Sequence, residues 1–99
     1  NAVVRAVEKI DSCLSKIVLK SLETDYAIII IADHGNAELM RNKDKTPNTA
    51  HTTNKVPCFA INTGFSTIKP GSLKDIAPTI LKVLNINKPI EMTGESLLF

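Results

Sequence analysis

The stretch that decides the fold is Tyr26-Ala27-Ile28-Ile29-Ile30-Ile31-Ala32, which runs directly into Asp33-His34-Gly35-Asn36. Four consecutive isoleucines have no polar face, so they fit a strand covered on both sides, as in the parallel sheet of an α/β protein. In such sheets ligands collect just beyond the carboxyl ends of the strands, which is where Asp33 and His34 fall. The segment therefore predicts an α/β fold with a candidate site at the end of this strand.

The residues on either side of this strand predict further elements. Upstream, apolar residues at helical spacing predict an amphipathic helix running to about Leu22. Downstream, residues 56–61 indicate a second buried strand, and Pro57 favours an edge or strand-start position for it. Asp75 then resembles the N-cap of a helix from Ile76 to about Leu84, with Pro78 in its first turn. The order is helix, strand, long loop, strand, helix, and a parallel relation between the two strands would demand a right-handed crossover.

The segment between the strands is the least regular part of the chain. A short helix is plausible after Gly35, through Met40, but residues 41–55 show no periodicity. A structureless loop of this length is unusual inside a compact domain unless it has a function. Glu38 and Asp44 are expected to be solvated rather than functional.

Bulk properties exclude several classes of function. The chain has 99 residues and a net charge of +2, which is too small to indicate nucleic acid or an anionic membrane as a partner. No signal peptide or membrane-spanning stretch is visible, and Cys13 and Cys58 are interpreted as reduced core thiols. A cytoplasmic protein is therefore expected. Because Asn1 lies inside a helical pattern, we interpret the chain as a piece of something longer.

Asp33 and His34 are candidate metal ligands, and a second histidine, His51, follows His34 after 17 positions. A hard carboxylate oxygen combined with imidazole nitrogens suits Mn²⁺ or Zn²⁺ better than Ca²⁺. Neighbouring strand residues point to opposite faces, but a bend at Gly35 would let both side chains reach one ion. The alternative is that these are ordinary loop residues. The threonines around His51 would satisfy loop backbone groups or support the ligands.

Four separated motifs, in order, resemble the C-terminal end of cofactor-independent (2,3-bisphosphoglycerate-independent) phosphoglycerate mutases, within the alkaline phosphatase superfamily. They are Asp33-His34-Gly35-Asn36-Ala37-Glu38, Ala50-His51-Thr52-Thr53-Asn54, Asp75-Ile76-Ala77-Pro78-Thr79 and Glu91-Met92-Thr93-Gly94. Phosphopentomutase is similar in this segment, but it usually has Asp-Pro after Gly-Asn and a charged residue after His-Thr. Ala37-Glu38 and Thr53-Asn54 favour the phosphoglycerate enzyme.

The resemblance implies that residues 1–99 are the C-terminal part of a metal-binding, phosphatase-like domain, a partial three-layer sandwich with a mainly parallel sheet. It implies a glycolytic isomerase that interconverts 3-phosphoglycerate and 2-phosphoglycerate through a phosphoserine at a site with two divalent cations, with Mn²⁺ expected. Asp33 and His34 would ligate the ion that activates the serine, and His51 would ligate the other. The full-length enzyme is expected to be a monomer.

The same resemblance implies that part of the site is missing from this chain. In the family the nucleophilic serine, the remaining ligands and the substrate-binding arginines lie elsewhere, so no catalytic residue is assigned here. We therefore expect the chain alone to be inactive, to bind divalent ions weakly and to dimerise through an exposed sheet edge. The alternatives are the equivalent segment of phosphopentomutase or another phosphatase of the superfamily, and a non-catalytic α/β binding module.

Overall fold

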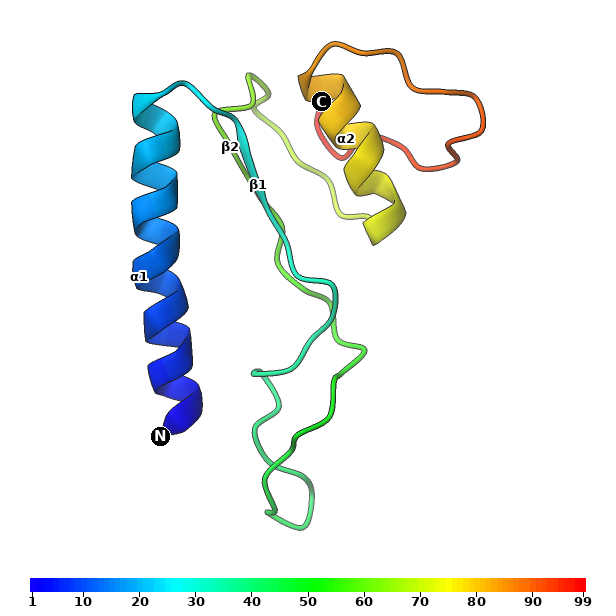
Figure 1. Ribbon diagram of the computed structural model, residues 1–99. Helices are drawn as coiled ribbons and strands as arrows, with labels where there is room; N and C mark the ends of the chain where they lie inside the picture. The colour runs from blue at the N-terminus through cyan, green and yellow to red at the C-terminus, as the bar shows by residue number, and fades with distance from the viewer.

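The computed structural model describes all 99 residues and contains two helices and two strands. In chain order the elements are α1 (Ala2–Glu23), β1 (Ile28–Ile30), β2 (Phe59–Ile61), the 3₁₀ turn η1 (Leu73–Asp75) and α2 (Ile76–Val83). Figure 1 shows the strand pair between the two helices, with α1 on one side and α2 on the other. The α/β class and the predicted helix–strand–loop–strand–helix order are confirmed.

The two strands pair in the antiparallel direction, with Ile28 opposite Ile61 and Ile30 opposite Phe59. The expected parallel relation between these two strands is therefore wrong. A parallel pair needs a crossover, usually a helix, whereas antiparallel strands can be joined by a chain that turns back on itself. The segment between β1 and β2 contains no helix and doubles back on itself through the antiparallel bridges Gly35–Thr52 and Arg41–Pro47, which returns the chain in the antiparallel sense. Each strand is also shorter than its apolar stretch.

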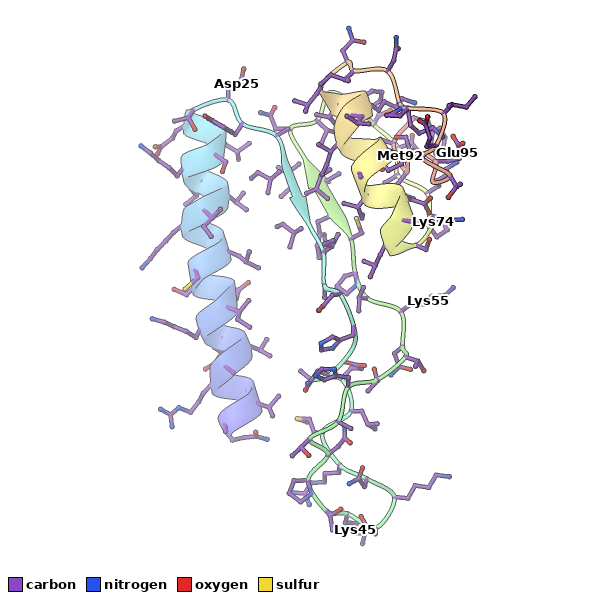
Figure 2. All side chains as sticks on the ribbon, turned by 45° about the vertical axis from the view of Figure 1, so that its right-hand side comes forward. Asp25, Lys45, Lys55, Lys74, Met92 and Glu95 are labelled. Atoms are coloured by element: carbon purple, nitrogen blue, oxygen red, sulfur yellow. The ribbon has the colours of Figure 1, made fainter.

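The long connection between the strands forms an extended, doubled-back hairpin rather than a structureless loop. The backbone N–H of Asn48 donates to the carbonyl oxygen of Met40 at 2.9 Å, and an isolated bridge joins Gly35 to Thr52. Lys45, labelled at the lower end of Figure 2, lies near the tip with a φ of 69°. The short helix expected through Met40 is absent because these residues use their backbone groups in the hairpin.

Helix α1 is amphipathic but makes no buried contact. The Asn1 side chain caps it by accepting from the N–H of Val3 at 3.0 Å, and none of its residues is buried. Its apolar positions, including Ile10 at 58% and Ile17 at 55% exposure, remain open to solvent. Neither helix combines the length and apolar character that spanning a bilayer requires.

The core lies at the C-terminal end of the chain. Six of the seven buried residues are found between Asp75 and Leu98, and the seventh is Gly35. The last residues pack on α2, where the Thr79 hydroxyl accepts from the N–H of Leu97 at 2.9 Å. A radius of gyration of 16.4 Å exceeds the roughly 13 Å of a compact domain of this size, so most of the chain is spread out around this small core.

Asp75 precedes α2 as predicted, but its side chain does not cap that helix. Its carboxylate accepts from the backbone N–H of Ser72 at 2.8 Å and that of Glu95 at 2.9 Å. The Ser72 N–H, followed by that of Glu95, lowers the pKa of Asp75 below its ordinary value. Asp75 therefore ties the C-terminal segment to the turn before α2.

Candidate functional site

The candidate site begins where β1 ends and the chain bends. The side chain of Asp33 is 83% exposed, while that of His34 is 34% exposed, so the carboxylate reaches into solvent and the ring is partly covered. His34 Nε2 lies 3.6 Å from Asp33 Oδ1. The bend after β1 thus brings these two neighbouring side chains close to each other.

One nitrogen of the His34 ring is already engaged. Nδ1 lies 2.9 Å from the carbonyl oxygen of Gly35, which can only accept, so Nδ1 carries the hydrogen. In the neutral ring the lone pair is then on Nε2, the nitrogen that faces Asp33. A histidine oriented through a backbone carbonyl in this way is the usual arrangement of a metal ligand.

The bridge between Gly35 and Thr52 brings the two histidines together. In an antiparallel pair, the residues before Gly35 and before Thr52 both project on the face opposite to that pair, as diagonal neighbours. His34 and His51 occupy these positions. Their rings stack with centroids 3.6 Å apart and planes inclined by 14°. Ligands from two segments therefore meet on one face of the hairpin.

Glu38 lies on the face of the hairpin opposite the histidines, where its carboxylate contacts the Thr52 hydroxyl. Its carboxylate accepts from the Thr52 hydroxyl, from the Asn54 amide at 3.1 Å and from the Asn36 backbone N–H at 2.8 Å. With the Thr52 hydroxyl as the main cause, these hydrogen bonds lower the pKa of Glu38 from its ordinary 4.5 to about 2. Glu38 is thus exposed, as expected of a solvated residue, but it is not free.

Gly35 is buried because Glu38 and Thr52 close over it. A Cβ atom added at Gly35 would collide with the Thr52 hydroxyl oxygen and the Glu38 carboxylate. A residue without a side chain is therefore required for these two groups to meet above the bridge.

An open cavity of about 480 Å³ adjoins the site. Asp33, His34, Ser72 and Leu97 are among the residues that line it. Its remaining wall includes Ile31, Ala32, residues 54–58, residues 68–71, Leu73 and Ile76. The cavity joins the end of β1 to the C-terminal core, while its walls mix apolar and polar side chains.

The residues of the site fit a divalent cation by chemistry but do not enclose one. The donors are one carboxylate and two imidazoles, a set that suits Mn²⁺ or Zn²⁺. A ring nitrogen's lone pair lies in the plane of its ring, so stacked rings direct their lone pairs along parallel planes rather than toward one ion. No group of three or more His, Cys, Asp or Glu side chains is arranged to hold a metal.

The candidate ligands predicted from the sequence thus lie close together, but the contacts of Glu38 next to them were not predicted. Asp33 lies beside His34, and the His34 ring stacks on that of His51. Glu38 was expected to be merely solvated. The available signal was a carboxylate four positions after His34 and a run of hydroxyl and amide donors at residues 52–54, next to His51.

Comparison with known proteins gives consistent matches along the chain. The model of the Metalloenzyme superfamily matches residues 1–88. The 2,3-bisphosphoglycerate-independent phosphoglycerate mutase of Flavobacterium johnsoniae is 47% identical over 97 residues, covering 98% of this chain and 19% of that protein. The enzyme of the same name from Flavobacterium psychrophilum is 48% identical over 98 residues, covering 99% of this chain and 19% of that protein.

A third relative matches the chain over a similar length. The enzyme of that name from Moorella thermoacetica is 43% identical over 99 residues, covering 98% of this chain and 19% of that protein. The chain therefore spans about a fifth of the length of the curated relatives it matches. The resemblance carried by the four sequence motifs is confirmed.

Proposed function

The chain belongs to the Metalloenzyme superfamily, and on that premise we propose that it is the C-terminal part of a phosphoglycerate mutase. The complete enzyme would interconvert 3-phosphoglycerate and 2-phosphoglycerate through a phosphoserine on a serine outside this chain. We further propose that the complete protein is a monomeric, cytoplasmic enzyme of glycolysis.

Within this proposal, Asp33 and His34 hold the ion next to the nucleophilic serine, and His51 holds a second ion. The observation that supports these roles is the Gly35–Thr52 bridge, which brings ligands from two segments to one face. The Gly35 carbonyl fixes His34 with Nε2 available as a ligand. Two bound divalent cations, proposed as Mn²⁺, would make the serine hydroxyl more acidic and offset charge on the transferring phosphoryl oxygens.

The chain by itself supplies too few groups for this chemistry. Asp33 and His34 leave their ion incompletely coordinated, and His51 leaves the other with one ligand from this chain. We therefore expect the 99-residue chain to show no conversion of 3-phosphoglycerate when Mn²⁺ is added. Turnover by the isolated chain would contradict the assignment of the nucleophile to a residue outside it.

A chimera tests the proposal directly. The matching region of the Flavobacterium johnsoniae mutase, 47% identical to this chain, is replaced by this chain, and conversion of 3-phosphoglycerate is measured with Mn²⁺. We expect an active chimera that loses activity on the order of 100-fold or more with Asp33→Ala, His34→Ala or His51→Ala. Asp44→Ala, in the tip of the same hairpin, is the matched control and should retain activity.

Two outcomes of this experiment would contradict different parts of the proposal. A folded chimera without activity would contradict the proposed function. An active chimera in which the three ligand variants match the Asp44→Ala control would contradict the ligand assignment while leaving the family membership intact.

A further inference from the structure

We propose that Glu38 is a positioning residue, whose carboxylate holds the segment bearing His51 against the turn bearing Asp33 and His34. This inference rests on the proposed function for the role of the histidines. The dependence of the histidine arrangement on Glu38 can be disproved without disproving the proposed function.

The contacts of Glu38 join two segments that are distant in sequence. One carboxylate oxygen accepts from the Thr52 hydroxyl and from the Asn54 amide, on the segment that follows His51. The other accepts from the backbone N–H of Asn36, just after the Asp33–His34 turn. A single carboxylate thus connects the residues next to each proposed ligand.

Thr52 is the point where this connection reaches the histidines. Its backbone N–H donates to the carbonyl oxygen of Gly35 at 2.9 Å, forming the bridge that places His34 and His51 on the opposite face. Its hydroxyl donates to Glu38 and also accepts from the N–H of Asn54 at 3.3 Å. Loss of the Glu38 carboxylate would leave that bridge as a single exposed pairing at an otherwise unpaired part of the hairpin.

The donors to Glu38 are all neutral, and no lysine or arginine forms an ion pair with it. Hydrogen bonds to an ionised acceptor are stronger than those between neutral groups, which favours the carboxylate over an amide in this place. Burial of Gly35 beneath Glu38 and Thr52 is a second observation that these groups are packed together.

Asp44 provides a matched control within the same hairpin. It is also an exposed carboxylate held by a threonine, accepting from the Thr46 hydroxyl at 2.6 Å and from the Thr46 N–H at 3.0 Å. The Thr46 hydroxyl lowers the pKa of Asp44 as well. Its hydrogen bonds, however, stay inside the tip and do not reach the segments that carry the proposed ligands.

The test uses the 99-residue chain and two NMR readouts. The first is the nuclear Overhauser effect between the His34 and His51 rings, which the 3.6 Å stacking predicts in the wild type. The second is the broadening of the signals of Asp33, His34 and His51 by added Mn²⁺. Glu38→Ala should abolish the cross-ring effect and reduce broadening at His51 about tenfold, while broadening at Asp33 and His34 persists. Asp44→Ala should match the wild type.

Two further variants guard against general unfolding. Glu38→Gln keeps one oxygen for Thr52 and Asn54, so it should restore part of both signals. Thr52→Val removes the hydroxyl at similar size and should reproduce Glu38→Ala. Unchanged spectra of Thr79 and Leu98 would verify that the C-terminal core is intact in each variant.

Different results would contradict the positioning role of Glu38 and the proposed function. The positioning role is overturned if the wild type lacks the cross-ring effect, or if Glu38→Ala and Thr52→Val retain both signals. Absence of Mn²⁺ broadening at all three proposed ligands in the wild type would instead count against the proposed function, while the cross-ring effect still decides the role of Glu38.

Discussion

The rings of His34 and His51 stack face to face with centroids 3.6 Å apart, although 17 positions separate them in the sequence. The Gly35–Thr52 bridge accounts for this contact, because it places the preceding residues as diagonal neighbours on one face. The relationship ties the candidate ligands to the backbone pairing of the hairpin. Changes that open the pairing should therefore disturb the ligands even when they leave both histidines in place.

Lowering the pH should weaken the hydrogen bonds that the Glu38 carboxylate accepts from Thr52, Asn54 and Asn36. The folded-state pKa of Glu38, about 2, lies below its ordinary 4.5, so its stabilising effect is present above about 4.5 and is lost as the pH falls toward 2. We expect the signal of the Asn36 backbone N–H, which donates to this carboxylate, to shift over this range. The carboxyl carbon of Glu38, followed by NMR, should titrate near 2, and a midpoint near 4.5 would show that the hydrogen bonds are not formed.

Substitution of Gly35 by alanine should separate the two segments. The new Cβ would meet the Thr52 hydroxyl and the Glu38 carboxylate, and overpacking of this kind costs about 1–3 kcal/mol. The cross-ring effect should therefore be lost. Gly64→Ala is the control, because nothing lies within 4 Å of its Cβ and only its φ of +81° is strained. Loss of the effect in Gly64→Ala alone would contradict this explanation.

The small C-terminal core should respond strongly to truncation. Leu98 is 2% exposed, and its replacement by alanine should lower the free energy of unfolding by about 2–5 kcal/mol. Ile90, 93% exposed, is the matched control, and its replacement should change that energy by less than about 0.5 kcal/mol. Denaturant unfolding of both variants provides the comparison, and equal midpoints would show that the C-terminal residues are not the core.

The isolated chain should associate with itself. Both strands have an unpaired edge, and α1 exposes apolar residues such as Val7 and Ile10. Light scattering at increasing concentration should show a mass above that of the 10.8 kDa monomer. Ile10→Lys should shift the association to higher concentration, and a monomeric mass at every concentration would contradict this prediction.

The sequence carried enough information for the order of elements and for the position of the candidate ligands. The isoleucine run predicted β1, and the helical spacing of apolar residues predicted α1 to within a residue or two of its end at Glu23. The direction of strand pairing was not predictable in this way. A continuous apolar run indicates that a strand is covered on both sides. The direction in which the two strands pair depends instead on the path of the chain between them, and no periodicity in the sequence encodes that path.

Glu38 escaped prediction for a related reason. A carboxylate in an irregular segment is usually solvated, and only the pairing of Gly35 with Thr52 shows that donors from residues 52–54 surround it. Asp75 likewise has the sequence position of an N-cap, yet its partners include Glu95, which lies 20 positions away. Both carboxylates act through tertiary contacts, and local patterns do not reveal those.

We propose that Asp33 and His34 bind one cation and that His51 binds another. Anomalous diffraction at the manganese edge, from crystals of the chimera grown with Mn²⁺, tests this most directly. Two anomalous peaks are expected, one bonded to the Asp33 carboxylate and His34 Nε2 and the other to the His51 ring. Peaks that lie away from all three side chains, or a single ion bound by both histidines, would contradict it.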